Sequence, residues 1–393
     1  MSAQTLTGLR PGDLVACALP PGDGWVSLID QVWQAGAALL PVDSRLPEPE
    51  ARELIGRARP TMLLTSDGSA RLEGETVSDG VAVVVATSGS TGSPRLVELS
   101  RDAIAAAVTS SAAVLGATGD DPWLCCIPVA HIGGLLVLLR HAVMGAPVIV
   151  HSGFSIDGVR DADVRFTSLV PTQLRRLLDA GVDCTRFSAL LIGGAAMPDG
   201  LRDEARRRGA NAVSTYGLTE SCGGVVYNGV PLPGTSVRIA DGEEIQLGGP
   251  TLMNRYRFDD AAGAAAFAPD GWLRTRDGGS LNDGVLTVSG RLDDVIVTGG
   301  EKVWPREVEE VLATHPQVAE VAVHGLPDDE WGQRVVAVVV PSDRASPPAL
   351  DSVRAHVART LPRYKAPREL VIVESLPRTS LGKVRAPRVR GGR

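Results

Sequence analysis

Short apolar runs alternate with segments of helical periodicity over roughly the first 230 residues, and this alternation most constrains the fold. Residues 13–20, 38–43 and 61–66 have the length and apolar character of strands. Residues 24–37 carry apolar side chains at helical spacing, and the segment from Pro47 begins with the proline and acidic residues typical of a helix start. Strands that alternate with helices predict a mostly parallel sheet covered by helices.

The character of the sequence changes twice towards the C-terminus. From about residue 230 to 290, short strands are separated by Gly and Asp turns, which predicts a β-subdomain. A strand, a Gly-Gly turn, a helix from Pro305, two strands, a helix and a final strand follow, which indicates a compact α+β domain of about a hundred residues. We therefore predict an α/β fold with a large N-terminal domain, 1–291, and a small C-terminal domain, 292–393.

Composition and charge argue against several classes of function. Hydrophobic residues make up 44 % of the 393 residues, which is ample for a large core, and the net charge is −7. Nucleic-acid and anionic-membrane binders carry basic surfaces, so we expect neither partner. Residues 132–150 form the most apolar long stretch, but Arg140 and His141 interrupt it. A buried helix followed by a strand, rather than a membrane span, is expected there.

The cysteines indicate a reducing compartment. Five cysteines are scattered along the chain, with neither a CxxC pair nor a Cys/His cluster of zinc spacing. Such a set fits reduced thiols in a cytosol. The N-terminal residues MSAQTLTGLRPGD lack the basic and apolar regions of a signal peptide. We therefore expect a cytoplasmic protein.

A loop rich in Gly, Ser and Thr follows the apolar run of residues 81–86. Its residues are Thr87, Ser88, Gly89, Ser90, Thr91 and Gly92. Glycines let backbone N–H groups approach an anion closely and hydroxyls add donors, so the loop suits a phosphate chain, although it lacks the GK[ST] of a Walker A loop. Arg95 would add positive charge for the outer phosphates. A plain surface turn and a solvated arginine are the alternatives. After this segment, Ser100 is expected to cap a helix.

The segment STYGLTE, residues 214–220, combines three kinds of side chain that bind a nucleotide. Tyr216 can stack on a base, Thr219 can bond a phosphate oxygen, and the Glu220 carboxylate can hold Mg²⁺. The alternative is a turn in which Thr219 caps a helix that carries Glu220 in its first turn.

Two further features lie nearer the C-terminus. The Asp277 carboxylate can accept both hydroxyls of a ribose, with Arg291 as its support, and a surface ion pair between turns is the alternative. Lys383, in PRTSLGK, would supply a mobile cation where acyl and phosphate oxygens meet, and otherwise it is an exposed lysine.

Each feature is weak alone, but in this order they resemble the adenylate-forming enzymes, which include acyl-CoA synthetases, luciferases and peptide-synthetase adenylation domains. The family's TSGSTGxPK appears as TSGSTGSPR and its YGxTE as YGLTE. Its GRxDD…GG-K…P.E.E appears as GRLDDVIVTGGEKVWPREVEEVL, and its terminal P-x-T-x-x-GK as PRTSLGK. The resemblance covers nearly the whole chain. It implies activation of a carboxylic acid by ATP and Mg²⁺ as an acyl-adenylate, followed by transfer to coenzyme A.

The resemblance also implies roles for residues of the large domain. The loop from Thr87 to Gly92 would hold the ATP phosphates. The segment Gly193, Gly194 and Ala195 matches the family's GGA, which lines the adenine and the acyl pocket. Tyr216, followed by Gly217, would lie against adenine. Thr219 would contact the α-phosphate, and Glu220 would bind Mg²⁺.

In the C-terminal part, the resemblance implies a movement between two half-reactions. Asp277 would bind the ribose hydroxyls, with Arg291 beside it. Asp293 matches the hinge about which the small mobile domain would swing. Lys383 would orient the attacking carboxylate and the α-phosphate in the first half-reaction only. The Gly299-Gly300 turn would then replace it and help to form the thiol tunnel.

The identity of the acid follows from resemblance alone. His131 matches a position that often borders the acyl pocket in this family, although a structural histidine is the alternative. The segments around His131 and TESCGGVVYNG, residues 219–229, are most similar to o-succinylbenzoate–CoA ligases of menaquinone biosynthesis. The implied acid is therefore o-succinylbenzoate.

Several positions depart from the family pattern. Arg95 replaces a lysine, and common glycines are replaced at three positions, namely Leu96, Arg255 and Arg276. These changes leave open another aromatic or short-chain acid, in a secondary-metabolite pathway, and a carrier protein instead of free coenzyme A as acceptor. A non-catalytic ligand-binding relative and an enzyme that activates a group other than a carboxylate are the remaining alternatives.

Overall fold

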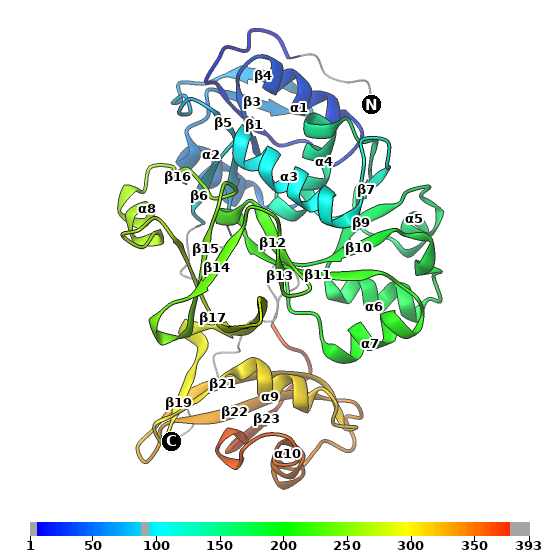
Figure 1. Cartoon of the computed structure of the whole chain (residues 1–393), viewed down its shortest axis with the longest axis vertical. Helices are drawn as coiled ribbons and strands as arrows, with labels where there is room; N and C mark the ends of the chain where they lie inside the picture. The colour runs from blue at the N-terminus through cyan, green and yellow to red at the C-terminus, as the bar shows by residue number, and fades with distance from the viewer. Residues whose placement is uncertain (1–5, 88–93, 378–393) are drawn as a thin grey trace. The chain divides into compact units, whose positions relative to one another are not determined.

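The computed structural model describes residues 6–87 and 94–377 (Figure 1). The chain forms two compact units. The first comprises Met1–Arg238, Gln246–Thr275 and Asn282–Leu286, and the second comprises Ile239–Ile245, Arg276–Leu281 and Thr287–Arg393. The expected α/β fold, with a large N-terminal and a small C-terminal domain, is confirmed.

The first sheet of the large unit has seven strands in the order β16-β6-β5-β2-β1-β3-β4. Its strands are β1 Leu14–Cys17, β2 Ala38–Pro41, β3 Met62–Thr65, β4 Gly68–Arg71, β5 Val81–Ala86, β6 Leu96–Ser100 and β16 Arg255–Tyr256. The central strands from β5 to β3 are parallel, as predicted, whereas β4, β6 and β16 add antiparallel edges. The sequence analysis assigned no strand to β6, which returns alongside β5.

The second sheet has seven strands in the order β13-β12-β11-β10-β9-β7-β8. Its strands are β7 Trp123–Cys125, β8 Val148–Val150, β9 Phe166–Leu169, β10 Ala189–Ile192, β11 Ala212–Leu218, β12 Gly223–Tyr227 and β13 Val230–Pro231. The strands from β8 to β11 are parallel, and β12 and β13 are antiparallel. Parallel strands are buried on both faces and are therefore almost wholly apolar, as β10 is.

Helices cover both sheets (Figure 1). They are α1 Gly24–Gln34, α2 Glu48–Ala58, α3 Arg101–Leu115, α4 Ile132–Met144, α5 Ile156–Asp161, α6 Pro171–Asp179 and α7 Asp199–Arg207. Helix α3 contacts β6 of the first sheet and β12 of the second, so it lies between them. The Ser100 hydroxyl accepts a hydrogen bond from the Ala103 N–H at 3.1 Å, which confirms the predicted cap.

The expected helix and strand in residues 132–150 are α4 and β8. None of the helices in the described ranges has the length and hydropathy that a membrane span requires.

The predicted β-subdomain is a four-stranded sheet in the order β14-β15-β17-β18. Its strands are β14 Ser236–Ile239, β15 Glu244–Gly248, β17 Leu273–Asn282 and β18 Val285–Arg291. The sequence analysis missed the neighbouring helix α8, Asp260–Ala266. The Asp259 carboxylate caps α8 by accepting a hydrogen bond from the Ala262 N–H at 3.0 Å, and its alanines favour a helix.

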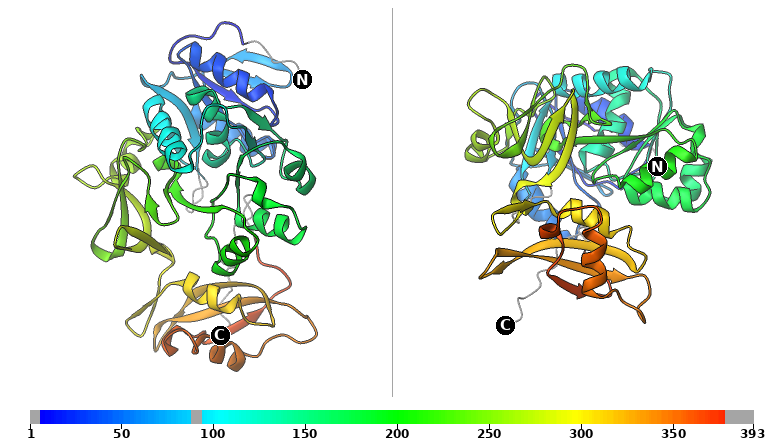
Figure 2. Two further views of the ribbon diagram at one scale, coloured as in Figure 1. Left: turned by 45° about the vertical axis from the view of Figure 1, so that its right-hand side comes forward. Right: turned by 60° about the horizontal axis from the view of Figure 1, so that its bottom comes forward.

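The second unit contains a five-stranded sheet in the order β20-β19-β22-β21, with β23 beside β22. Its elements are β19 Ile296–Thr298, β20 Glu301–Val303, α9 Pro305–Leu312, β21 Val318–Asp328, β22 Gly332–Pro341, α10 Leu350–Val357 and β23 Glu369–Ile372. The helices α9 and α10 lie side by side (Figure 2), and Val308 and Val353 pack with Val335 and Ala337 in one core cluster. The predicted order of elements from Pro305 onwards is confirmed.

Five short 3₁₀ turns complete the described chain. They are η1 Cys184–Arg186, η2 Thr219–Ser221, η3 Asp241–Glu243, η4 Leu292–Asp294 and η5 Arg363–Lys365. Two of them contain candidate site residues, because η2 holds Thr219 and Glu220, and η4 holds Asp293.

Candidate active site

Thr87 and Arg95 pair at the base of the connection between β5 and β6. The Thr87 N–H donates to the Arg95 carbonyl oxygen at 2.8 Å, and the Arg95 N–H donates to Thr87 Oγ1 at 3.3 Å. Arg95 is thereby fixed at the mouth of the predicted phosphate loop. The candidate residues Ser88, Gly89, Ser90, Thr91, Gly92 and Lys383 lie outside the described residues.

The short edge strand β16 is anchored next to this hairpin by a buried ion pair. Arg257 Nη1 donates to Glu98 Oε1 at 2.9 Å, and both side chains are fully buried. Arg255 Nε donates to the other carboxylate oxygen of Glu98 at 2.9 Å. Arg257 also donates to the carbonyl oxygens of Ala58, at 2.9 Å, and Glu75, at 2.6 Å. Since a buried charge is tolerated only with such partners, this network fixes the position of β16.

Tyr256 lies between these two arginines, and successive side chains of a strand point to opposite faces. Its hydroxyl donates to Glu220 Oε1 at 2.7 Å, and the Arg95 guanidinium lies over its ring, 5.2 Å from the centroid. Burial and the negative charge of Glu220 raise the pKa of Tyr256, so the hydroxyl keeps its proton and acts as the donor. The side chains of two candidate residues, Arg95 and Glu220, therefore both contact Tyr256, which was not predicted from the sequence to be a site residue. Its only signal was its position beside the unusual Arg255.

Glu220 has the properties of a magnesium ligand. It is half-buried in η2, and within the described residues no hydrogen bond or ion pair reaches Oε2. Magnesium in nucleotide sites takes one or two carboxylates and fills its other positions with phosphate oxygens and water. The described part of the chain contains no cluster of three or more His, Cys, Asp or Glu side chains that would hold a metal by themselves. A single carboxylate such as Glu220 suits a metal that arrives with a nucleotide.

The turn that carries Glu220 differs from the helix start that was the alternative interpretation of this segment. The Ser221 hydroxyl accepts a hydrogen bond from the Leu218 N–H at 2.9 Å and thus closes η2, so Thr219 is not its cap. The backbone oxygen of Glu220 accepts a hydrogen bond from the Met253 N–H at 2.8 Å. The Thr219 hydroxyl is therefore not committed to capping this turn, and its predicted contact with a phosphate stays a prediction.

The candidate residues Gly193 and Gly194 follow β10, whose neighbour β11 is parallel to it. Carboxyl ends of parallel strands are the usual ligand side of an α/β sheet. A Cβ atom on Gly193 would lie 2.5 Å from Thr215 Oγ1, so this position requires glycine. Gly194 has a φ of 76°, in the left-handed region, and both Gly194 and Ala195 are exposed. The GGA segment therefore presents backbone next to the segment that carries Tyr216.

Tyr216 and Gly217 lie at a β-bulge in the hairpin of β11 and β12. Tyr216 pairs with Val226, and the register shifts between Tyr216 and Gly217. A Cβ atom on Gly217 would collide with the carbonyl oxygen of Gly223. The bulge places Tyr216, which is half-buried, at the carboxyl end of the parallel strands. This placement suits a ring that stacks on a ligand.

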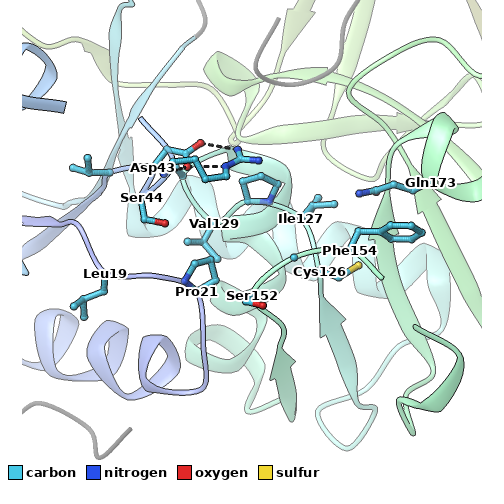
Figure 3. Close-up of a pocket in the computed structure, with 15 residues that line it drawn as sticks. Leu19, Pro21, Asp43, Ser44, Cys126, Ile127, Val129, Ser152, Phe154 and Gln173 are labelled. Atoms are coloured by element: carbon cyan, nitrogen blue, oxygen red, sulfur yellow. Dashed lines mark hydrogen bonds and ion pairs between the residues drawn. The ribbon is translucent and has the colours of Figure 1, made fainter. Parts of the chain in front are cut away.

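His131 precedes α4 and is half-buried. A cavity of about 240 Å³ lies nearby, lined by segments that follow strands of both sheets (Figure 3). Asp43 faces Phe154 and Gln173 across it. Arg45 also lines the cavity. Burial disfavours the ionised form of Asp43. Hydrogen bonds from Arg45 and the positive charges of Arg45 and His131 outweigh this effect and hold the pKa of Asp43 below its usual value. The His131 side of the large unit therefore combines a cavity with a fixed charge pair.

The remaining candidate residues belong to the small unit. Arg291 Nη1 donates to Asp277 Oδ1 at 3.1 Å, so the ion pair between these residues is present; the Asp277 carboxylate is buried, whereas the Arg291 side chain is 39 % exposed. Arg276 Nη2 donates to Asp293 Oδ1 at 2.7 Å, between two exposed side chains. Gly299 and Gly300 form the turn between β19 and β20 with φ values of 59° and 84°, which glycine adopts most readily.

Comparisons with known proteins identify the family. A model described as AMP-binding enzyme matches residues 71–257, and one described as AMP-binding enzyme C-terminal domain matches residues 307–383. A probable 2-succinylbenzoate–CoA ligase of Mycobacterium tuberculosis is 42 % identical over 365 residues, which cover 89 % of this chain and 94 % of that protein. The chain belongs to the AMP-binding enzyme family.

Two solved structures are similar to this AMP-binding enzyme over nearly its whole length. The Bacillus subtilis o-succinylbenzoate CoA synthetase in complex with its acyl-adenylate intermediate has a TM-score of 0.87 and 29 % identity, and the match covers 98 % of this chain and 89 % of that one. The same synthetase with ATP and a magnesium ion has a TM-score of 0.85 and 28 % identity, with 96 % and 89 % covered. The family resemblance expected from the four motifs is thereby confirmed.

Proposed function

We propose that this AMP-binding enzyme is an ATP-dependent acid–thiol ligase that converts o-succinylbenzoate to its acyl-adenylate and then to its coenzyme A thioester. The observation that carries the proposal is that Arg95, at the base of the Gly/Ser/Thr loop, and Glu220 both contact the side chain of Tyr256. A cation for phosphate and a carboxylate for Mg²⁺ are thus placed together. The choice of acid is supported by the 42 % identity to a probable 2-succinylbenzoate–CoA ligase.

In the first half-reaction, a carboxylate oxygen of the acid attacks the α-phosphorus of ATP, and pyrophosphate leaves. Acid and ATP repel each other, so residues 87–92 and Arg95 bind the phosphates, and bound Mg²⁺ neutralises part of their charge. Glu220 holds that ion, and Thr219 contacts the α-phosphate. Tyr216 lies against adenine beside the GGA segment. Lys383 orients the two reacting groups.

In the second half-reaction, the coenzyme A thiol attacks the acyl carbonyl carbon, and AMP leaves. Asp277 and Arg291 keep the ribose in place, and the Gly299-Gly300 turn replaces Lys383 after movement of residues 292–393 about Asp293. His131 borders the acyl group. A cytoplasmic location fits the five cysteines, all of which are buried free thiols.

The proposal is tested by product analysis. Purified protein is incubated with o-succinylbenzoate, ATP, Mg²⁺ and coenzyme A, and the thioester and AMP are detected by mass spectrometry. Both should form in equal amounts, and Glu220→Gln should lower their rate by at least about tenfold because a metal ligand is lost. Glu53→Gln, an exposed carboxylate on α2, is the matched control and should behave as wild type.

Other outcomes have distinct meanings. AMP without a thioester would point to a different acceptor, such as a carrier protein. A thioester with another aromatic or short-chain acid, and none with o-succinylbenzoate, would keep the reaction and contradict the substrate. No product with any acid would contradict the proposed function.

A further inference from the structure

Tyr256 contacts both Arg95 and Glu220 with its side chain. Its hydroxyl reaches Oε1 of Glu220, and its ring lies under the Arg95 guanidinium. The residue is only 4 % exposed, so its own side chain is shielded from water, whereas Glu220 is half-buried and Arg95 is exposed. A hydrogen bond to a charged group is shorter and stronger than one between neutral groups. The bond from Tyr256 therefore restricts the orientation of the Glu220 carboxylate.

We propose that Tyr256 is the positioning residue for magnesium binding: its hydroxyl holds Glu220 Oε1 so that Oε2 is presented to the metal, while its ring supports Arg95 above the phosphates. This inference rests on the proposed function. Tyr256 touches neither the metal nor the substrate in this account, because it acts through Glu220 and Arg95.

The contacts that hold β16, the strand of Tyr256, in place support this role. The strand β16 pairs with β6. The two residues before β16 are also held, because the Met253 N–H donates to the Glu220 carbonyl oxygen at 2.8 Å and the Asn254 N–H donates to that of Glu98 at 2.9 Å. The buried pair of Glu98 and Arg257 then holds the other face of the strand. An oriented donor on a fixed strand restricts a flexible carboxylate.

The choice of a phenol also has a physical reason. A lysine or arginine in the place of Tyr256 would pair with Glu220, neutralise its charge and weaken its attraction for Mg²⁺. The hydroxyl is a neutral donor that bonds to Glu220 Oε1 at 2.7 Å without adding a positive charge. It therefore orients the carboxylate and leaves the negative charge available.

The departure at Arg255 acquires a structural role in the same arrangement. Arg255 Nε donates to Glu98 Oε2 at 2.9 Å. The arginine supplies a second partner for a fully buried carboxylate. It thus helps to hold in place the strand that carries Tyr256.

Tyr256→Phe tests the proposal, because it removes only the hydroxyl. ATP binding is measured by calorimetry over a series of Mg²⁺ concentrations, without acid or coenzyme A. Loss of a group that orients a metal ligand costs about 10- to 100-fold in metal affinity. We therefore expect the Mg²⁺ concentration for half-maximal ATP binding to rise at least about tenfold, with the thermal midpoint close to that of wild type.

Two controls separate positioning from a general loss of packing. Tyr227→Phe removes another buried phenol hydroxyl of the same unit, which bonds to Ser111 Oγ at 2.8 Å, and should leave the magnesium dependence unchanged. In a Glu220→Gln background, Tyr256→Phe should have no further effect, because the two residues act on one ion.

An unchanged magnesium dependence of Tyr256→Phe, with ATP binding of the wild type intact, would overturn the inference alone. An equal effect in the Glu220→Gln background would overturn it too, because Tyr256 would then act independently of the carboxylate. Wild-type protein that binds no ATP in the presence of Mg²⁺ would instead overturn the proposed function and the inference with it.

Discussion

The charged residues around β16 and those around β17 are of the same kinds but differ in their access to water. The side chains of Glu98 and Arg257 are 0 % exposed, whereas those of Arg276 and Asp293 are 60 % and 53 % exposed. A buried pair costs several kcal/mol to break by removal of one partner, while an exposed pair contributes about 0–1 kcal/mol. The first region is therefore built to keep one geometry, and the second can exchange partners at little cost.

Among the substitutions that test this comparison, removal of Arg257 should cause the largest loss in the free energy of unfolding. Arg257→Met leaves the buried Glu98 with Arg255 as its remaining partner and deprives three carbonyl oxygens of donors. We expect a loss of about 3–5 kcal/mol in the free energy of unfolding, measured with urea by tryptophan fluorescence. Arg52→Met, which breaks an exposed pair with Glu48 in the same unit, should cost less than about 1 kcal/mol. Equal losses would remove the basis of the comparison.

Substitution of a closely packed glycine and of an exposed glycine extends the comparison of the two regions to the backbone. Gly217→Ala should lower the free energy of unfolding by about 1–3 kcal/mol and slow adenylation, since its Cβ atom collides with the Gly223 carbonyl oxygen. Gly300→Ala has open space, so only its φ of 84° opposes it, at about 1 kcal/mol. Urea unfolding of both variants, with pyrophosphate exchange, checks this. A Gly217→Ala variant as stable as wild type would contradict the packing that we describe around Glu220.

A half-buried carboxylate of the small unit, Glu309, gives a pH-dependent effect. Burial and the neighbouring Asp294 and Glu310 raise the pKa of Glu309 above its ordinary value. The folded state therefore binds this proton more tightly than the unfolded chain, and stability is lost as the pH rises from the ordinary value through the raised pKa. Glu309→Gln should remove that loss and stabilise the protein at pH 8 by on the order of 1 kcal/mol, but not at pH 4.

Urea unfolding of Glu309→Gln and wild type at the two pH values makes this measurement. The Val323 N–H donates to Glu309 Oε1 at 2.8 Å, and a glutamine oxygen can accept the same bond. Glu301→Gln, an exposed carboxylate in β20, is the control and should show no such difference. Equal stabilisation at both pH values would exclude titration of Glu309 as the cause.

The smallest effect is expected at Arg276. Its φ of 60° lies in the left-handed region, so Arg276→Gly relieves backbone strain but also breaks the exposed pair with Asp293. The two contributions oppose each other, and the free energy of unfolding should change by less than about 1 kcal/mol. A loss above about 2 kcal/mol in urea unfolding would show that the exposed pair is a structural anchor after all.

Most of the fold was predictable because it depends on local patterns. Short apolar runs and helical spacing identified β1, β2, α1 and α9, and Ser100 identified the start of α3. The strands β6 and β16 were missed because an antiparallel edge is decided by its partner and not by its own sequence. Helix α8 was missed because its alanines follow turn-like residues, and its capping by Asp259 is visible only in the structure.

The candidate site was predictable only where its residues lie in motifs. Thr87, Glu220 and Asp277 stand in contiguous segments that carry their own chemical signature. Tyr256 has no such segment, and its partner Glu220 lies 36 residues earlier in the chain. The bond between them depends on the pairing of β16 with β6, which is a tertiary contact. Sequence patterns therefore predict the groups that do the chemistry better than those that position them.

The most direct test of the proposed function is ATP–pyrophosphate exchange by the wild-type protein, with o-succinylbenzoate and a panel of other aromatic and short-chain acids. Exchange reports formation of the acyl-adenylate without any need for the thiol acceptor. The account predicts exchange that requires Mg²⁺ and is fastest with o-succinylbenzoate. Faster exchange with another acid would contradict the substrate, and no exchange with any acid would contradict the central claim that this protein forms an acyl-adenylate.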